Sequence, residues 1–399
     1  MKNSRETMDI TKLREETPLC PDVIHFNNAG ASPMPQPVYE RLVTYLQREQ
    51  EMGGYEAQAE HQQEIEDAYR SLADLVGAQP SELALVGSAS RAFQFGLSAL
   101  PLEAGDKILT SRLEYVTIFM NLLQRREAGI EIEVVPEDGH GVVDLEHLEQ
   151  AIDDRTRLIV LTHIPTHTGT VQPAEAVGRI AREHGLTYFL NATQSLGVYP
   201  LHVKKIGCDL LCSTSRKWLR GPRGLGMLYV GSRLMEQLNP PFPDVRAAVW
   251  EEPYRFRWPS DARAFETWES NPAATLALGE AAAYAQNVGL EAIWQRVQEL
   301  ARYLRQRLGE LPGAKVHDRG QTLSGIVAFT LEGVPPLKVK EYLRERKINV
   351  YTVGAKNALL DMQDWDVDEI VRASVHYFNT EGEVDTVVRT LGEASFSSI

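Results

Sequence analysis

The sequence predicts an α/β protein with a mostly parallel sheet between helices, followed by a smaller α/β unit. Three observations support this prediction. Seven short apolar runs lie between residues 83 and 230, and segments with helical spacing separate several of them. Unbroken apolar runs are typical of strands that helices cover on both faces. Polar motifs follow several runs, at the strand ends where such sheets bind ligands, and from about Pro272 long helices precede further strands.

The apolar runs are the expected strands of the large sheet. In order they are Leu83–Gly87, Lys107–Ser111, Ile130–Pro136, Leu158–Ile164, Leu186–Ala192, Leu210–Ser215 and Gly226–Val230. Between the fourth and the fifth run, "AEAVGRIAREHG" has apolar residues at helical spacing and ends on Gly185, which is typical of a helix.

The last third of the chain predicts the second unit. "AATLALGEAAAYAQNVG" and "LEAIWQRVQELARYLRQRLGEL" favour long helices, and "LSGIVAFTL", "INVYTV" and "IVRASVHYF" favour strands. We expect an N-terminal arm (1–30) that packs with the small domain. A large domain (31–258) and a connecting helix with the small domain (259–399) follow. No repeat or low-complexity linker separates the units, so we expect them to pack tightly.

Composition limits the possible functions. Of 399 residues, 43% are hydrophobic and 24% are charged, which is ordinary for a globular protein. The net charge of −14 argues against a nucleic-acid partner. The chain shows neither a signal peptide nor a membrane span, which predicts a soluble cytoplasmic protein without a membrane partner. Its three cysteines form no C-x-x-C pair, so no disulfide framework or zinc site is expected.

The densest chemical motif is "STSRKWLRGPRGLGMLYV", in which Lys217 follows three hydroxyl residues and Arg216. A lysine at a strand end, beside hydroxyls and an arginine, suits a Schiff base with an aldehyde that carries a phosphate. Taken alone, the segment is better explained as a solvated basic turn. His163 and His167 are four residues apart, but Pro165 between them opposes a helix, and we expect no metal site.

An ordered series of motifs raises the specificity of this interpretation. "FNNAG", "TGTVQP", "NATQSLG", "STSRKWLRGPRG" and "RASVHYFNT" occur in that order along nearly the whole chain. Together they resemble the class V aminotransferase family of pyridoxal-phosphate enzymes, which includes cysteine desulfurases, kynureninase and isopenicillin N epimerase. The resemblance implies the fold-type I architecture with a seven-stranded sheet and pyridoxal 5′-phosphate as cofactor. It also implies a homodimer with active sites at the interface.

The resemblance also implies residue roles. Lys217 matches the lysine that binds the cofactor aldehyde and acts as catalytic base. Arg372 matches the arginine that grips the substrate carboxylate, with a structural ion pair as the alternative, and Asn28 is a further substrate-binding candidate. The remaining cofactor-binding candidates are Ala89, Ser90, Thr214 and Arg216 at the phosphate, Tyr115 on the ring face, Thr166 and Gln194 near the phenolic oxygen, and Asn191 at the ring nitrogen.

Three departures from the family pattern narrow the function. The stretch "GAKNALLDMQDWDVDEIVR" holds no cysteine, where cysteine desulfurases carry their catalytic one. "FETWESNPAA" resembles the branch that contains the ergothioneine-pathway C–S lyase. Asn191 replaces an aspartate that keeps the ring nitrogen protonated, and an amide has no charge with which to hold that proton.

The predicted reaction follows from these departures. A weaker electron sink should penalise transamination more than β-elimination of a thiolate. We therefore expect cleavage of the Cβ–S bond in a cysteine S-conjugate, an amino-acid substrate. An aminotransferase or an epimerase on the same scaffold is the alternative. A non-catalytic protein that binds the cofactor, or an engineered Asp-to-Asn change, would also explain Asn191.

Overall fold

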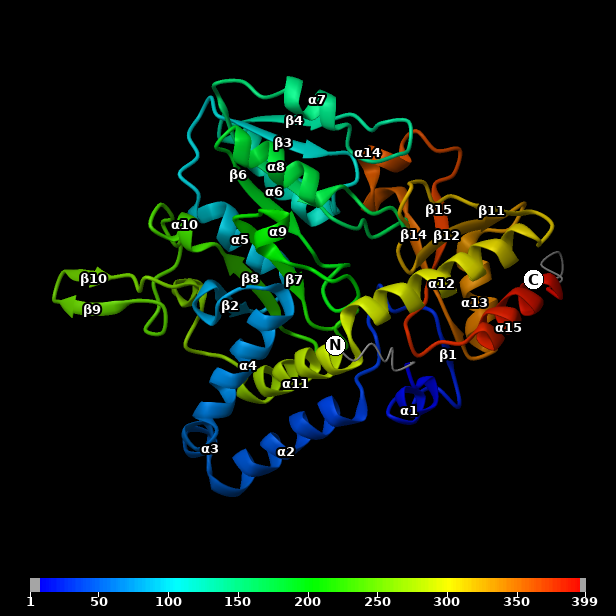
Figure 1. Ribbon diagram of the computed structural model, residues 1–399, viewed down its shortest axis with the longest axis horizontal. Coiled ribbons are helices and arrows are strands. Elements are labelled where there is room, and N and C mark those ends of the chain that lie inside the picture. The colour runs from blue at the N-terminus through cyan, green and yellow to red at the C-terminus, as the bar shows by residue number, and fades with distance from the viewer. Residues whose placement is uncertain (1–7, 395–399) are drawn as a thin grey trace, which may run out of the picture.

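A seven-stranded sheet forms the centre of the larger of two packed units in the computed structural model, which describes residues 8–394 (Figure 1). Its strands are β2 (Leu83–Val86), β3 (Lys107–Ser111), β4 (Glu131–Val135), β5 (Thr156–Thr162), β6 (Thr187–Asn191), β7 (Leu210–Thr214) and β8 (Gly226–Val230). The spatial order is β2-β8-β7-β6-β5-β3-β4, in which β8 runs antiparallel to both neighbours and the other pairs are parallel. All seven predicted strands are confirmed, and the sheet is mainly parallel as expected.

Helices cover both faces of this sheet. On one face lie α5 (Ala89–Ala99) and α6 (Val116–Glu127), and on the other lie α4 (Gln62–Val76) and α8 (Ala174–Glu183). Strand β6 contributes side chains to the hydrophobic cores on both faces of the sheet, because successive side chains of a strand point to opposite faces. Phe189 packs in the core under α5 and α6, while Tyr188 and Leu190 pack in the other.

The smaller unit contains a four-stranded antiparallel sheet. It consists of β11 (Ala314–Val316), β12 (Ile326–Leu331), β15 (Glu369–Ser374) and β14 (Tyr351–Gly354), in that spatial order. Helices α13 (Pro336–Glu345) and α15 (Glu381–Gly392) pack on it with α12 (Leu290–Gly309). The short β1 (Ile24–His25) pairs with β13 (Ile348–Asn349), which ties the N-terminal segment to this unit. The predicted strands of the last third are confirmed, whereas β11 was not expected.

The two units are joined by the predicted long helices. Helix α11 (Pro272–Val288) packs against α2 (Gln36–Met52) and α4, and α12 carries the chain from there to the small unit (Figure 1). The first turn of α11 is stabilised by Asn271, whose side chain accepts a hydrogen bond from Ala274 N at 2.9 Å. Within residues 8–394, no helix combines the length and the apolar content needed to cross a bilayer.

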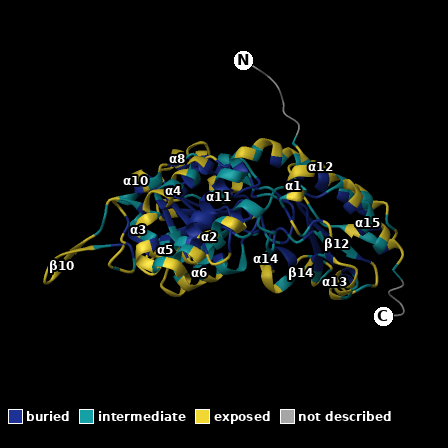
Figure 2. Ribbon diagram, turned by 90° about the horizontal axis from the view of Figure 1, so that it is seen from below, coloured by how far each residue is buried: buried dark blue, intermediate teal, exposed yellow. Residues whose placement is uncertain are grey.

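A hairpin of two exposed strands was not expected either. The hairpin β9 (Val249–Glu252) and β10 (Arg255–Arg257) projects from the large unit, and all its strand residues are exposed (Figures 1 and 2). The remaining short α-helices are α1 (Ile10–Glu15), α3 (Gly54–Glu60), α7 (Leu145–Gln150), α9 (Val203–Ile206), α10 (Ser232–Met235) and α14 (Leu359–Met362).

Candidate active site

A pocket forms where β6 and β7 end beside the first turn of α5. Its lining residues come from five segments, namely Gly87, Ser88, Ala89, Ser90, Tyr115, Ile118, Asn191, Thr193, Thr214, Arg216, Lys217 and Gly224. Seven of the predicted site residues line this one pocket, although they are distributed over more than a hundred residues of sequence. The structure therefore brings together Ala89, Ser90, Tyr115, Asn191, Thr214, Arg216 and Lys217.

The start of α5 forms one wall of the pocket. The side chain of Ser88 caps the helix by accepting from Arg91 N at 3.2 Å, which leaves the first-turn N–H groups of Ala89 and Ser90 without intrahelical partners. Helix starts of this kind bind anions. Gly226 permits the arrangement, because a Cβ at that position would lie 2.3 Å from the Ser88 carbonyl carbon.

Two further side chains complete the anion-binding end. Thr214 donates its hydroxyl proton to Leu225 O at 3.1 Å, so it offers a ligand only its lone pairs unless the hydroxyl rotates. Arg216 hydrogen-bonds to Gly30 O, and burial together with the nearby Arg223 lowers the pKa of its guanidinium. The positive charge and the open helix start fit a phosphate.

Lys217 is the nucleophile candidate of the pocket. Its side chain is buried and has no hydrogen bond or ion pair with any residue between 8 and 394. The pKa of its ammonium lies well below the usual value, chiefly because burial disfavours the charge and secondarily because Arg372 and Arg216 are nearby. A neutral amine without an internal acceptor is suited to attack an aldehyde, so these residues fit pyridoxal phosphate.

Arg372 reaches the same region from β15 of the small unit. Its Nη1 donates to Thr166 O at 2.8 Å and to Thr166 Oγ1 at 3.0 Å, and its Nη2 donates to Asn27 Oδ1 at 3.2 Å. The Nε–H has no partner, and no carboxylate pairs with this buried cation within the described chain. Burial lowers its pKa to about 10, so Arg372 is charged at neutral pH. The structural ion pair considered as an alternative is not present among the described residues.

Gln194 and Thr166 form hydrogen bonds on the side of Arg372 where its Nη1 donates. Gln194 accepts from Trp218 Nε1 at 2.8 Å and donates to Ala29 O at 3.2 Å and Thr166 Oγ1 at 3.3 Å. Thr166 thereby links the glutamine to Arg372. Both residues lie beside the pocket without lining it.

The amide of Asn28 is occupied by the backbone. It donates to Ser374 O at 2.8 Å and to His25 O at 3.1 Å, and it accepts from Ser32 Oγ at 3.0 Å. Its neighbour Asn27 is the residue that contacts Arg372. The role of Asn28 in substrate binding stays a prediction, and the geometry adds Asn27 as a candidate that sequence reasoning missed.

Asn191 belongs to a buried chain of hydrogen bonds. Its Oδ1 accepts from Thr193 N at 3.1 Å, and its Nδ2 donates to Thr162 Oγ1 at 2.9 Å. Thr162 donates in turn to Glu114 Oε2 at 2.6 Å, and Thr162 N donates to Glu114 Oε1 at 2.7 Å. Sequence reasoning missed Glu114 and Thr162. The available signal was a charged residue directly before Tyr115, in a segment that leads into a helix.

None of the three cysteines is accessible. Cys20, Cys208 and Cys212 are all buried, and burial raises the pKa of each thiol. The segment before β15 contains α14 instead of a thiol. There Asp361 accepts from His167 Nε2 at 2.7 Å and from Arg319 Nη2 at 2.8 Å, which ties the segment to both units.

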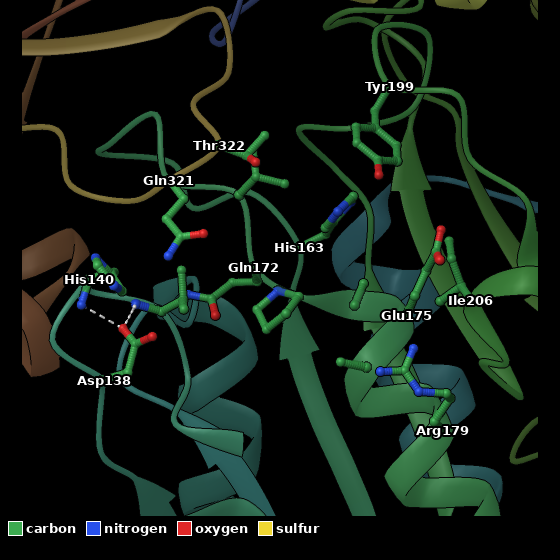
Figure 3. Close-up of a pocket in the computed structure, with 15 residues that line it drawn as sticks. Asp138, His140, His163, Gln172, Glu175, Arg179, Tyr199, Ile206, Gln321 and Thr322 are labelled. Carbon is green, nitrogen blue, oxygen red and sulfur yellow. Dashed lines mark hydrogen bonds between the residues drawn. The ribbon is translucent and has the colours of Figure 1, made fainter. Parts of the chain in front are cut away.

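A second pocket lies between the two units, beside His163 at the end of β5 (Figure 3). It has a volume of about 460 Å³, and His163, Gln172, Arg179 and Gln321 lie around it. His163 Nδ1 forms a hydrogen bond with Ser195 Oγ at 2.9 Å, and burial lowers the pKa of His163 to about 4, so the ring is neutral. None of the predicted site residues lines this pocket.

Comparison with known proteins identifies related sequences and folds. The sequence profile of the aminotransferase class-V family matches residues 24–387. A probable cysteine desulfurase of Methanothermobacter thermautotrophicus is 28% identical over 390 residues, covering 96% of this chain and 97% of that protein.

Two solved structures share the fold. An apo cysteine desulfurase from Thermococcus onnurineus superimposes with a TM-score of 0.91 at 24% identity, covering 100% of both chains. The cystine C–S lyase C-DES, in complex with its reaction product cysteine persulfide, gives a TM-score of 0.85 at 22% identity, covering 94% of this chain and 99% of that one. Another C-DES structure has glycine covalently linked to its PLP cofactor.

Proposed function

We propose that this protein, which belongs to the class V aminotransferase family, cleaves the Cβ–S bond of a cysteine derivative by β-elimination. It is a pyridoxal-phosphate enzyme of fold-type I. The observation that carries the proposal is Arg372, a buried cation with a free Nε–H and no carboxylate partner among residues 8–394. A buried unpaired charge is costly, and an α-carboxylate would neutralise it.

The residues around the pocket divide the work of holding the cofactor. Ala89, Ser90 and Arg216 would hold the phosphate, Tyr115 would lie on the ring, and Asn191 would face its nitrogen. When bound, the cofactor supplies an aldehyde that reacts with amines and a ring that withdraws electrons from the substrate's α-carbon.

The chain's own groups would carry the remaining steps. The Nε–H and the second Nη2–H of Arg372 form a fork that fits one carboxylate, which fixes the α-carbon. Burial lowers the pKa of Lys217 and so favours its neutral form, which can take up the α-proton as a general base. Water is largely excluded, since Lys217 and Arg372 are 8% and 4% exposed.

The overall reaction balances with one water. A cysteine S-conjugate and water yield the thiol, pyruvate and ammonium. The choice of sulfur as the leaving group is supported by the relatives named desulfurase and C–S lyase. Its release as a small molecule is supported by the three buried cysteines, because no exposed thiol could accept it. The resemblance of the Trp268 segment to the ergothioneine-pathway lyase extends the proposal to conjugates with a substituent on sulfur.

Desulfuration of free cysteine is the second candidate, which the names of the relatives favour. One assay separates the two. The purified holoenzyme is incubated with cysteine, cystine and S-substituted cysteines, and pyruvate, alanine, thiol and keto acid are measured together. Pyruvate with thiol is the expected result. Alanine as the main product would replace the lyase by a desulfurase, and amino-group exchange would replace it by an aminotransferase.

We also propose a homodimer. Large apolar side chains are exposed on one continuous part of the chain, including Phe242, Val245, Trp250, Phe256 and Trp268. The hairpin of β9 and β10 extends this part away from the body of the subunit (Figure 2). Such a surface is typical of an interface. Light scattering should give twice the chain mass of 44.7 kDa, and Trp250→Ser should weaken the association.

A further inference from the structure

The contacts of the Asn191 amide identify its oxygen and nitrogen ends. A backbone N–H can only donate, so the atom 3.1 Å from Thr193 N is the oxygen Oδ1. The thiol of Cys212 also points to Oδ1, at 3.8 Å. Both lone pairs of the oxygen therefore face donors, and Nδ2 lies on the side of Thr162.

Glu114 sets the direction of the hydrogen bonds beyond Asn191. An ionised carboxylate accepts only, so the hydroxyl proton of Thr162 points to Glu114 Oε2 at 2.6 Å. The Thr162 oxygen then presents a lone pair to Asn191 Nδ2 at 2.9 Å. All the bonds run in one direction, from Asn191 through Thr162 to Glu114.

This polarity leaves Asn191 one free hydrogen-bonding group. Thr162 takes one of the two Nδ2 protons, and the second has no acceptor among the described residues. Asn191 lines the cofactor pocket, where a ring nitrogen would meet the amide. An N–H can donate to the lone pair of a neutral pyridine, whereas a pyridinium N–H would oppose it donor to donor.

We propose that Glu114 is a positioning residue that acts through Thr162 to keep the free N–H of Asn191 directed at the cofactor's ring nitrogen, so that this nitrogen stays unprotonated. The inference rests on cofactor binding within the proposed function and does not depend on which amino acid is cleaved. It also accounts for an amide at position 191, because two carboxylates would compete for the single Thr162 hydroxyl.

The surroundings of Glu114 make this arrangement sensitive to pH. Burial raises the pKa of Glu114 to about 7, and the hydrogen bonds from Thr162 oppose that shift only in part. The other titratable groups beside it are Tyr188 of β6 and Cys212 of β7, both buried and with raised pKa values. Neither group is a cation that would hold Glu114 ionised. Protonating the Glu114 carboxylate therefore removes the acceptor that orients the Thr162 hydroxyl.

Substituting Glu114→Gln should reverse the chain of bonds. Thr162 N–H requires an acceptor, so the glutamine oxygen would take it and the glutamine NH₂ would face Thr162 Oγ1. Thr162 would then donate toward Asn191, whose NH₂ could no longer stay where it is. Thr162→Val removes the connection with little change of volume, and Thr162→Ser keeps it.

The test uses the holoenzyme reconstituted with pyridoxal phosphate labelled with ¹⁵N in the ring, because the ¹⁵N chemical shift reports protonation without any substrate. Well above the Glu114 pKa of about 7, the wild type and Thr162→Ser should show a neutral pyridine. Glu114→Gln and Thr162→Val should shift toward pyridinium, with Asn191→Asp as the reference for the protonated ring. Lowering the pH through 7 should produce the same shift in the wild type.

Two results would overturn the proposal. One is a protonated ring nitrogen in the wild type at a pH well above the Glu114 pKa of about 7. The other is an unchanged ¹⁵N shift in Thr162→Val that binds the cofactor stoichiometrically and melts as one species. If Glu114→Gln fails to fold, the difference in ¹⁵N chemical shift between Thr162→Val and Thr162→Ser still tests the proposal. Failure of the proposed C–S cleavage would leave these spectra unaffected, so the two proposals fail separately.

Discussion

Substituting Arg372→Lys tests the carboxylate site most directly. Lysine keeps the charge but presents a point donor in place of the fork formed by Nε–H and Nη2–H. Loss of one charge-assisted hydrogen bond costs about 1.5–3 kcal/mol. The bonds that position the guanidinium on Thr166 and Asn27 are lost as well, which brings the total to about 2–4 kcal/mol. We therefore expect kcat/KM for the amino acid to fall roughly 30- to 1000-fold.

The assay compares two substrates. An S-substituted cysteine carries the α-carboxylate, and the corresponding S-substituted cysteamine lacks it. Arg372→Lys should reduce kcat/KM for the first and leave the slow reaction of the second nearly unchanged, with cofactor binding intact. An equal loss on both substrates would refute the assignment of Arg372 to the carboxylate.

Arg220 provides a matched control for this experiment. It is also a buried arginine with no carboxylate partner among residues 8–394, but each of its three nitrogens donates to a neutral group: Pro33 O at 2.9 Å, Tyr377 Oη at 2.6 Å and Thr17 Oγ1 at 2.6 Å. Arg220→Lys should lower the melting temperature without changing the ratio of kcat/KM between the two substrates. If Arg220→Lys also changed this ratio, the ratio would reflect general loss of structure and could not be assigned to the carboxylate contact of Arg372.

Three further predictions follow from the same geometry. Lys217→Ala should abolish the visible absorbance near roughly 400 nm that bound pyridoxal phosphate gives when linked to an amine, while circular dichroism shows an intact fold; unchanged absorbance would remove Lys217 from its role. Asn191→Asp should protonate the ring nitrogen, lower the fraction of turnovers that end in β-elimination and raise the fraction that end in transamination, both measured from pyruvate and amino-group exchange. If every reaction gains equally, an engineered or impaired site explains Asn191 better. Iodoacetamide should leave native activity unchanged, because Cys20, Cys208 and Cys212 are buried with raised pKa values; rapid inactivation would indicate that a thiol takes part.

Local patterns were sufficient to predict the frame of the protein. Each strand of the large sheet is covered on both faces, so its sequence is continuously apolar and easily found. The motif around Lys217 was also visible, because hydroxyls, a lysine and glycines follow one another directly. The exposed hairpin at 249–257 escaped prediction, since its side chains face solvent and carry no pattern imposed by a core.

The relations between distant segments could not be predicted in the same way. Glu114 contacts Thr162 across 48 residues, and the contact exists only because β3 and β5 are neighbours in the sheet. Nothing in either segment alone indicates the pairing. Likewise, two adjacent asparagines look equivalent in the sequence. Only the fold decides that Asn28 satisfies backbone groups and that Asn27 faces Arg372.

The inaccessibility of the three thiols has a consequence for how sulfur would travel after the reaction. An enzyme that stores sulfur on its own surface can pass it to an acceptor protein during a direct encounter, and the two surfaces then select each other. With every cysteine enclosed, the released thiol would instead enter the surrounding water as a free metabolite. Its capture would depend on its concentration and on the affinity of whatever consumes it. Specificity in sulfur delivery would therefore belong to the downstream consumer, and this protein would determine only the rate of supply.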